Sequence, residues 1–281
     1  MEWYVFFAVL FGAACHAGWN AFLKIKLEPF TAMALIAIMS ALVVAPVMPF
    51  LPVPPAAAWP WIIASVIFHL GYFIGLTEAY RTGDMGQVYP IARGSAPLLT
   101  ASGSVILVGE RIGPLAWAGV LLLAGGVVLM SLRGGRDLAR LDRRAVGFAL
   151  FTAVTICAYS LVDGIGARRA GNPHAYSAAL FIGIAPVMIV YALARDGVLT
   201  LPKTYRDWIT GLGGGALQLG SYGIAIWAMT LAPIAIVAAL RETSVLFGAV
   251  IAVAVLGEPL RAVRVAAAVT IVAGLVLIRL S

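Results

Sequence analysis

The feature that most constrains this chain is a series of long apolar runs separated by short polar, Pro-rich or Gly-rich connectors. A helix needs roughly 20 predominantly apolar residues to cross the hydrocarbon core of a membrane. The runs of suitable length are Trp3 to Leu23, Phe30 to Leu51, Trp59 to Tyr80, Met85 to Val108, Pro114 to Leu132, Ala145 to Ala167, His174 to Ala194, Trp208 to Leu231, Pro233 to Leu256 and Val263 to Ile278. Lipid offers the backbone no hydrogen-bond partner, so each run must pair its own peptide groups. We therefore predict an all-α integral membrane protein with ten transmembrane helices.

Composition excludes several other classes of protein. With 62% hydrophobic and 11% charged residues, the chain lacks the charged surface of a soluble domain. Its net charge of +7 comes from connectors and not from a basic stripe, so we predict no nucleic-acid partner. Cys15 and Cys157 each lie inside an apolar run, so we expect neither a disulfide nor a metal site, and no cofactor. The first run lacks a cleavage pattern and is predicted to be a helix, not a removable signal peptide.

An internal repeat appears when the chain is shifted by 148 positions. Arg93 then falls on Arg241, Gly109-Glu110 falls on Gly257-Glu258, and Gly126 falls on Gly274. Duplicated halves are common among transporters. Coincidences between apolar residues carry little weight, but the matched Arg and Gly-Glu residues indicate a duplication.

The longest polar connector, residues 133–144, lies near the middle of the chain and separates the two halves. We predict a first repeat over residues 1–134 and a second over residues 135–281. Five helices is an odd number, so the second repeat must enter the membrane from the opposite face and is inverted. Lys and Arg number 13 on the side of the central connector and four on the other. This bias predicts a cytoplasmic central connector and external termini.

The repeated motifs VGER (Val108 to Arg111) and LGEP (Leu256 to Pro259) each close the fourth helix of a half. With the small-residue first helix, they make the chain similar to the drug/metabolite transporter superfamily, in its ten-helix EamA branch. The resemblance implies a central cavity lined by the first, third and fourth helices of each half, peripheral fifth and tenth helices, and alternating access. The segment HAGWN, from His16 to Asn20, resembles a subgroup associated with phosphonate utilisation.

Arg93 and Arg241 are the foremost candidates for a substrate site. A charged group in the hydrocarbon costs roughly 2.5 to 3.5 kcal/mol on insertion scales, so each is a functional hypothesis. Equivalent positions in an inverted repeat bring both guanidiniums toward one centre, where each can bind a carboxylate or phosphate-type group through two hydrogen bonds. The alternative is a structural ion pair, for which Glu242 supplies a carboxylate, although it does not face the adjacent Arg241 on a helix.

Polar and aromatic residues at helical spacing suggest the rest of the cavity wall. Steps of three or four residues place Tyr89 and Pro97 with Arg93, and Ser244 with Arg241. Aromatic rings and amides suit a site for a small organic molecule, although Tyr and Trp also form interfacial belts. The predicted substrate-binding residues are Arg93, Arg241, Trp19, Asn20, Tyr72, Tyr89, Tyr159, Gln218, Tyr222 and Ser244.

Three titratable residues are candidates for proton coupling. His16 has a reference pKa of about 6.5, but a histidine hydrogen-bonded between helices is the commoner role. Asp163 follows Thr152, Thr155 and Tyr159 on one helical face and could bind a proton or an ammonium group. Glu78 is the third candidate. Nearby arginines leave open that Asp163 and Glu78 are charges at the ends of helices.

Four residues are predicted to have structural or gating roles. Glu110 and Glu258 meet the unfavourable end of a helix dipole, so each needs a compensating partner. We expect each to cap the N-terminus of the next helix. Pro90 and Pro97 have no backbone N–H, so each leaves a carbonyl of the preceding turn without its helical partner. Such carbonyls are tolerated in a membrane where protein groups or a water-filled cavity can satisfy them.

These features favour a secondary transporter over an intramembrane enzyme, an ATP-driven pump, a channel and a lipid flippase. The sequence contains no catalytic motif or paired intramembrane aspartates and no nucleotide-binding loop, so we predict neither an enzyme nor an ATP-driven pump. A channel would more commonly assemble its filter from several chains. A lipid flippase remains an alternative. We expect a permease or exporter for a small anionic or zwitterionic metabolite, such as an amino acid or phosphonate-like compound, in a bacterial inner membrane. It would contact lipids, couple to protons or exchange, and act as a monomer or homodimer.

Overall fold

The computed structural model describes residues 1–22, 29–83, 85–131, 142–197, 204–254 and 261–281, and all regular elements in these ranges are helical. The helices are α1 (Trp3–Phe22), α2 (Pro29–Val44), η1 (Ala45–Phe50), η2 (Ala56–Ala58), α3 (Trp59–Thr82), α4 (Met85–Gly103), η3 (Ser104–Val108), α5 (Pro114–Ser131), α6 (Arg143–Ala170), α7 (Pro173–Asp196), α8 (Tyr205–Leu231), α9 (Ile234–Arg241), α10 (Ser244–Ala254) and α11 (Ala262–Leu280). In the described part of the chain, α2 continues into η1, α4 into η3, and α9 into α10, so ten segments cross the molecule.

The predicted fold class is confirmed. Among the described residues, seven helices are long and apolar enough to span a membrane, and α5 is a shorter apolar helix. The two further segments, α1 and α8, are 20 and 27 residues long and carry polar residues such as His16 and Gln218. Every apolar run identified in the sequence is therefore a membrane-crossing helix of a multi-pass protein.

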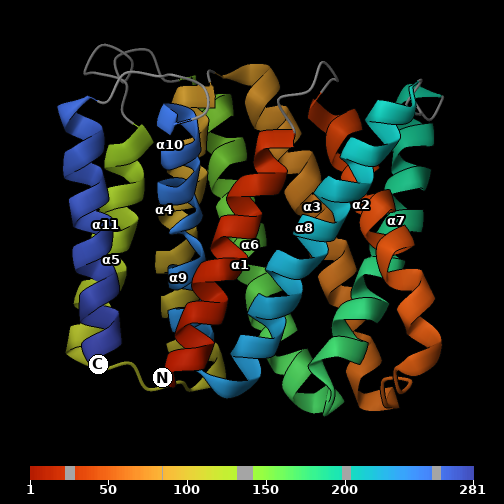
Figure 1. Cartoon of the computed structure of the whole chain (residues 1–281), viewed down its shortest axis with the longest axis horizontal. Coiled ribbons are helices and arrows are strands. Elements are labelled where there is room, and N and C mark those ends of the chain that lie inside the picture. Colours follow the sequence, from red (N-terminus) through yellow and green to blue (C-terminus); the bar gives the residue numbers. More distant parts are fainter. Residues whose placement is uncertain (23–28, 84, 132–141, 198–203, 255–260) are drawn as a thin grey trace.

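The two halves are inverted and interlocked. The chain begins and ends at the same side of the molecule, whereas α6 begins at the opposite side (Figure 1). Helices of one half pack against helices of the other, in the pairs α1 with α8, α3 with α6, α2 with α7, α4 with α9, and α5 with α11. When the two halves are exchanged, each pair becomes a pair of the same set. For example, α1 with α8 becomes α6 with α3. Neither half thus buries its inner face without the other.

One break distinguishes the halves. The ninth segment is interrupted after Arg241, where the Glu242 and Thr243 amides donate to carbonyls three residues back instead of four. The Thr243 hydroxyl also donates to the Leu240 carbonyl at 2.7 Å, which competes with the helical ladder. The equivalent stretch of α4, around Gly94, is continuous. The break changes the direction in which residues after Arg241 project.

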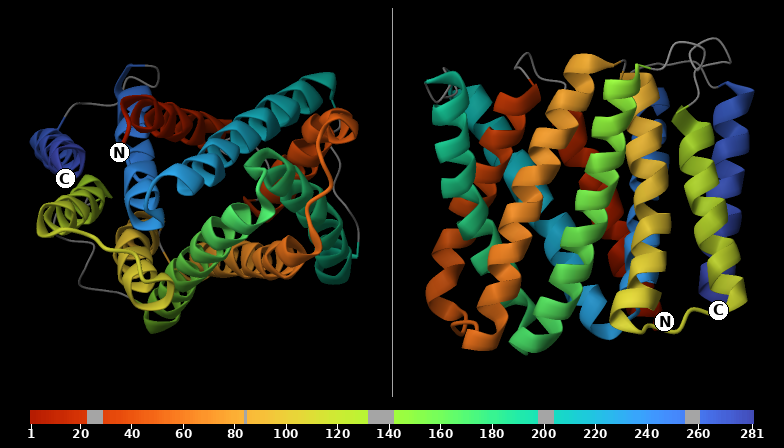
Figure 2. Two further views of the ribbon diagram at one scale, coloured as in Figure 1. Left: turned by 90° about the horizontal axis from the view of Figure 1, so that it is seen from below. Right: turned by 180° about the vertical axis from the view of Figure 1, so that it is seen from behind.

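The pair α5 and α11 stands at one end of the molecule (Figure 2), where α5 also packs against α4. The backbones of α5 and α11 approach at Gly119 and Gly274, where a Cβ on Gly274 would lie 2.8 Å from the Gly119 carbonyl oxygen. Small residues permit such close packing in membranes. The implied peripheral position of the fifth and tenth helices is confirmed. They pair with each other and do not line the cavity.

Gly274→Ala should weaken this helix pair. The added methyl group meets backbone atoms that cannot rotate away, so we expect a loss of about 1–3 kcal/mol in the free energy of unfolding. Gly125→Ala is the matched control, because nothing lies within 4 Å of a Cβ at that position. It should leave stability equal or slightly higher, since alanine favours helices. Unfolding in detergent measures both, and equal effects of the two substitutions would contradict the close packing.

Candidate functional site

A cavity lies between the two halves, and its roughly 510 Å³ of empty space includes space open to solvent. Its wall combines aromatic rings, amide and imidazole groups and one arginine. The lining residues are His16, Trp19, Ala37, His69, Tyr72, Phe73, Tyr159, Phe181, Ile184, Gln218, Ser221, Tyr222 and Arg241. They come from α1, α2, α3, α6, α7, α8 and α9.

Packed aromatic rings form one wall of the cavity. His69 stacks on Tyr159 with ring centroids 4.2 Å apart and an interplanar angle of 22°. Tyr159 meets Tyr72 and Tyr222 edge to face, with centroids 5.9 and 5.7 Å away. Phe181 contacts the other side of Tyr222. Such edge-to-face pairs hold rings in fixed orientations, so this wall is rigid.

Asp163 lies behind this wall and has no solvent exposure. The Tyr176 hydroxyl donates to its Oδ1 at 2.9 Å, and the Tyr222 hydroxyl donates to its Oδ2. A buried carboxylate is costly unless it accepts hydrogen bonds, and these two phenols provide them. Asp163 is therefore separated from the cavity by the ring of Tyr222, and it is not a charge at a helix end.

Arg241 is the arginine on the cavity wall. Its guanidinium carbon lies 4.6 Å from the centre of the Tyr222 ring, a cation–π contact. The side chain is 9% exposed, and its Nε has no hydrogen-bond partner among the described residues. A buried guanidinium donor without an acceptor is costly. Arg241 therefore retains hydrogen-bonding capacity beside the cavity.

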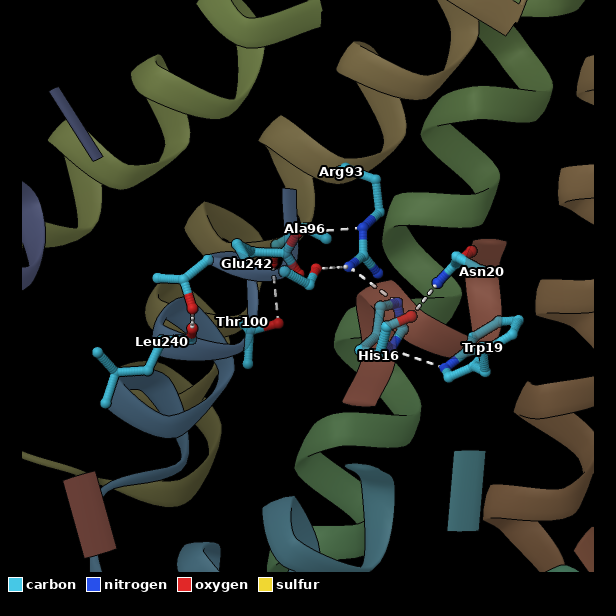
Figure 3. A network of polar contacts seen from close by, with 10 residues as sticks. His16, Trp19, Asn20, Arg93, Ala96, Thr100, Leu240 and Glu242 are labelled. Carbon is cyan, nitrogen blue, oxygen red and sulfur yellow. Dashed lines mark hydrogen bonds and ion pairs between the residues drawn. The ribbon is translucent and has the colours of Figure 1, made fainter. Parts of the chain in front are cut away.

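Arg93, in α4, lies one layer behind the wall and is paired. Its Nε is 3.1 Å from the Glu242 carboxylate, and both side chains are almost fully buried. Its Nη2 lies 3.3 Å from His16 Nε2 and donates to Ser244 Oγ at 3.3 Å. Figure 3 shows Arg93 between Glu242 and His16. Glu242 neutralises the charge of Arg93, and this ion pair links α4 to the break between α9 and α10.

Glu242→Ala should destabilise the protein strongly. Removing one partner of a buried ion pair leaves an uncompensated charge, at a cost of about 3–5 kcal/mol. The double variant Arg93→Met/Glu242→Leu removes both charges and should recover most of this loss. Unfolding in detergent tests both variants. Wild-type stability of Glu242→Ala would show that the pair contributes nothing.

The structure places most of the predicted substrate-binding residues around one cavity. Trp19, Tyr72, Tyr159, Gln218, Tyr222 and Arg241 line it. Gln218 accepts a hydrogen bond of 2.8 Å from Ser40, so the remaining hydrogen-bonding groups of its amide are donors. Arg93 and Ser244 lie behind the wall, and Asn20 donates to the His16 carbonyl of its own helix. Their roles in binding stay predictions.

Other predicted residues lie elsewhere. Glu78 is not on the cavity wall and pairs with Arg81 at 2.8 Å near the end of α3. Pro97 is buried in α4, whereas the side chains of Tyr89 and Pro90 and all of Glu258 lie outside the described residues. The implied lining also needs correction. The second helices, α2 and α7, contribute residues, whereas α4 supplies none. Arg93 is held behind the wall by its ion pair.

His69 and Phe181 are wall residues that sequence reasoning missed. His69 lies three residues before Tyr72, so helical spacing alone could have placed both on one face. Phe181 lies in an apolar helix where no spacing signal distinguishes it from lipid-facing residues. Only the packing of α7 against α3 and α8 brings it to the cavity.

Glu110 joins the two halves at one end of the molecule. Its carboxylate accepts from the amides of Ile234 at 2.9 Å and Ala235 at 3.4 Å, which are the first residues of α9. Arg168 pairs with it at 2.7 Å and also donates to the carbonyls of Met229 and Ala232. The expected capping occurs, but the capped helix is α9 and not the next helix, α5. The inverted packing brings the α9 N-terminus closer than the sequence order suggests.

Glu110→Ala should cost about 1–3 kcal/mol of stability, because it leaves two helix amides and Arg168 without their shared acceptor. Glu78→Ala is the matched control. It removes an ion pair with a well-exposed arginine, and such pairs contribute less than about 1 kcal/mol. Thermal unfolding of both variants in detergent gives the comparison. A larger loss for Glu78→Ala would contradict the role of Glu110 as a cap.

Comparison with known proteins identifies the family. The profile of the EamA-like transporter family matches residues 3–132 and again residues 143–280. The chain belongs to this family. EamA-like proteins are transporters, and the cavity lies between the two matched repeats. The double match agrees with the duplicated, ten-helix architecture.

Curated relatives match only a part of this EamA-like chain. The spermidine export protein MdtI of Klebsiella pneumoniae is 34% identical over 70 residues, which are 25% of this chain and 64% of the relative. The protein of the same name from Salmonella enteritidis is 31% identical over 68 residues, 24% of this chain and 62% of the relative. The chain thus spans less than two thirds of these relatives. A solved crystal structure has a TM-score of 0.77 at 18% identity, covering 98% of this chain and 95% of that one, and it shows the fold.

Proposed function

We propose that this EamA-like protein is a secondary transporter for a small organic solute with an anionic or zwitterionic head group. The observation that carries the proposal is Arg241, a guanidinium on the cavity wall with an unsatisfied Nε. A carboxylate or phosphonate oxygen would complete its hydrogen bonding. Arg241 offers a planar fork that matches such groups.

The two arginines then have different tasks. Arg93 already has a carboxylate partner in Glu242, so binding an anion there would break a buried ion pair. Arg241 packs against the Tyr222 ring, and no salt bridge to it is found among the described residues. A substrate anion at Arg241 adds an ion pair without removing one. We therefore assign the head group to Arg241 and a supporting role to Arg93.

Asp163 is the best-placed candidate for proton coupling. It is a buried carboxylate whose hydrogen-bond partner Tyr222 also lies under the Arg241 guanidinium. An anion on Arg241 changes the electrostatic field at Asp163 through this single ring. We propose that Asp163 takes up or releases a proton as the substrate binds and leaves.

The Glu110 contacts support alternating access. They join the ends of α6 and α8 and the start of α9 at one face of the molecule. We propose that this cluster holds that end closed, and that the halves rock when it separates. The protein would act as an exporter or permease in a bacterial inner membrane, as a monomer or homodimer.

A polyamine substrate is the second candidate. The matched relatives are named spermidine export proteins, and the aromatic wall with Asp163 behind it offers π faces to an ammonium group. Arg241 opposes this function, because a guanidinium on the same wall repels a cation. The two candidates therefore predict opposite effects of removing Arg241.

The test is counterflow in proteoliposomes with labelled amino acids, phosphonates and spermidine. For an anionic or zwitterionic solute, Arg241→Gln should reduce transport tenfold or more, whereas Arg241→Lys should retain part of it. Arg261→Gln is the control, since Arg261 is exposed at the start of α11. Spermidine transport that survives Arg241→Gln would favour the polyamine. Movement of labelled lipids alone would identify a flippase.

A further inference from the structure

The imidazole of His16 lies between two groups that can only donate hydrogen bonds. The Trp19 indole N–H is directed at His16 Nδ1 as a hydrogen-bond donor at 3.3 Å, and Arg93 Nη2 lies 3.3 Å from His16 Nε2 (Figure 3). Neither an indole N–H nor a guanidinium can accept a hydrogen bond. The neutral imidazole has one N–H and one lone pair, so it can satisfy only one of these neighbours.

Charge decides which neighbour receives the lone pair. A hydrogen bond from a guanidinium is about twice as strong as one between neutral groups. An N–H on Nε2 would also point its positive end at the Arg93 cation. The lone pair therefore belongs on Nε2, facing Arg93, and the proton on Nδ1, facing Trp19. An imidazolium would place two cations in contact and would offer a lone pair to neither neighbour.

This tautomer brings two N–H groups together at the cavity wall. His16 Nδ1–H and Trp19 Nε1–H have nitrogens 3.3 Å apart, and both residues line the cavity. A single oxygen at about 2.9 Å from each nitrogen can accept from both, which is ordinary hydrogen-bond geometry. Without such an oxygen, the two donors face each other.

We propose that His16 and Trp19 form an oxyanion subsite that binds one oxygen of the substrate's head group. This inference rests on the proposed function and specifies its substrate class. Two further groups on this wall, the Arg241 guanidinium and the Gln218 amide nitrogen, can only donate, whereas the hydroxyls of Tyr72, Tyr159 and Ser221 can donate or accept. A carboxylate or phosphonate supplies the acceptors that these groups lack. An ammonium group supplies only further donors, so the subsite selects against polyamines.

The first experiment reads the tautomer directly. Protein labelled with 15N-histidine, in lipid nanodiscs and without substrate, gives distinct nitrogen shifts for the two neutral forms, and His16→Gln assigns the signal. We expect proton occupancy of Nδ1 in His16. Occupancy of Nε2, or an imidazolium at neutral pH, would overturn the subsite. The measurement needs no transported solute, so it is independent of the proposed function.

The second experiment uses two variants that each retain the hydrogen-bonding role of one imidazole nitrogen. His16→Asn retains a donor near the position of Nδ1, whereas His16→Gln retains an acceptor near Nε2 for Arg93. Glycine and methylphosphonate are the probes, with methylamine as the cationic control. Binding is read from the chemical shift of the Trp19 indole N–H, and thermal unfolding checks that each variant folds.

We expect glycine and methylphosphonate, which each carry an anionic head group, to shift the Trp19 indole signal, and methylamine not to shift it. His16→Gln should weaken probe binding about tenfold, the usual effect of losing a hydrogen bond to a charged group, and His16→Asn should weaken it less. The reverse order would assign His16 to positioning Arg93 and overturn the subsite, as would the absence of any probe-induced shift.

Transport data separate the two proposals. Trp19→Phe keeps the ring but removes the N–H, so the subsite predicts a higher half-saturating concentration for the transported anion. If Arg241→Gln abolishes transport while Trp19→Phe and His16→Gln leave it unchanged, the subsite fails and the function stands. If anionic probes shift the Trp19 signal but no anionic solute is transported, the subsite stands and the function fails.

Discussion

The buried ion pair between Arg93 and Glu242 is the interaction on which the rest of the site depends. Two charges in a low-dielectric interior are tolerable only together, so α4 of one half must meet the break in the ninth segment of the other. The contact positions His16 against Arg93 and leaves Arg241 to face the cavity. A single charge pair thus decides which arginine is structural and which is available to a ligand.

The inverted duplication explains the symmetry of the fold, and the pair Arg93–Glu242 lies at a departure from that symmetry. Helix pairs repeat when the halves are exchanged, as expected for two related copies packed face to face. Glu242, however, corresponds to Gly94 in the first copy, which packs closely against Val128 of α5 and has no room for a carboxylate. A binding site for an asymmetric solute needs such a difference, because identical walls would present the same groups twice.

Much of the fold was predictable, because an apolar run that crosses the hydrocarbon core of a membrane must form a helix to pair its own backbone groups. The predicted runs agree with the helices to within a few residues, and α5 and α11 lie away from the cavity, as the family resemblance implied. Contacts between helices were less predictable. Glu110 caps α9 instead of α5, and Arg93 makes the ion pair with Glu242 that the sequence had left open. Both contacts join residues more than 120 positions apart. Helical spacing within one segment carries no information about such distances.

The sequence by itself determined that the chain spans a membrane with ten helices in two inverted halves. The lengths of the apolar runs and the repeat at 148 positions can be read from the sequence without any knowledge of contacts between helices. It also identified Arg241, Trp19, Tyr72, Tyr159, Gln218 and Tyr222 as candidates for the substrate site. The structure shows that these six residues line one cavity. Only the tertiary structure decided which charges neutralise one another and which donors lack acceptors. Those properties depend on distances of a few ångströms between helices from different halves, and the packing of the two halves sets these distances.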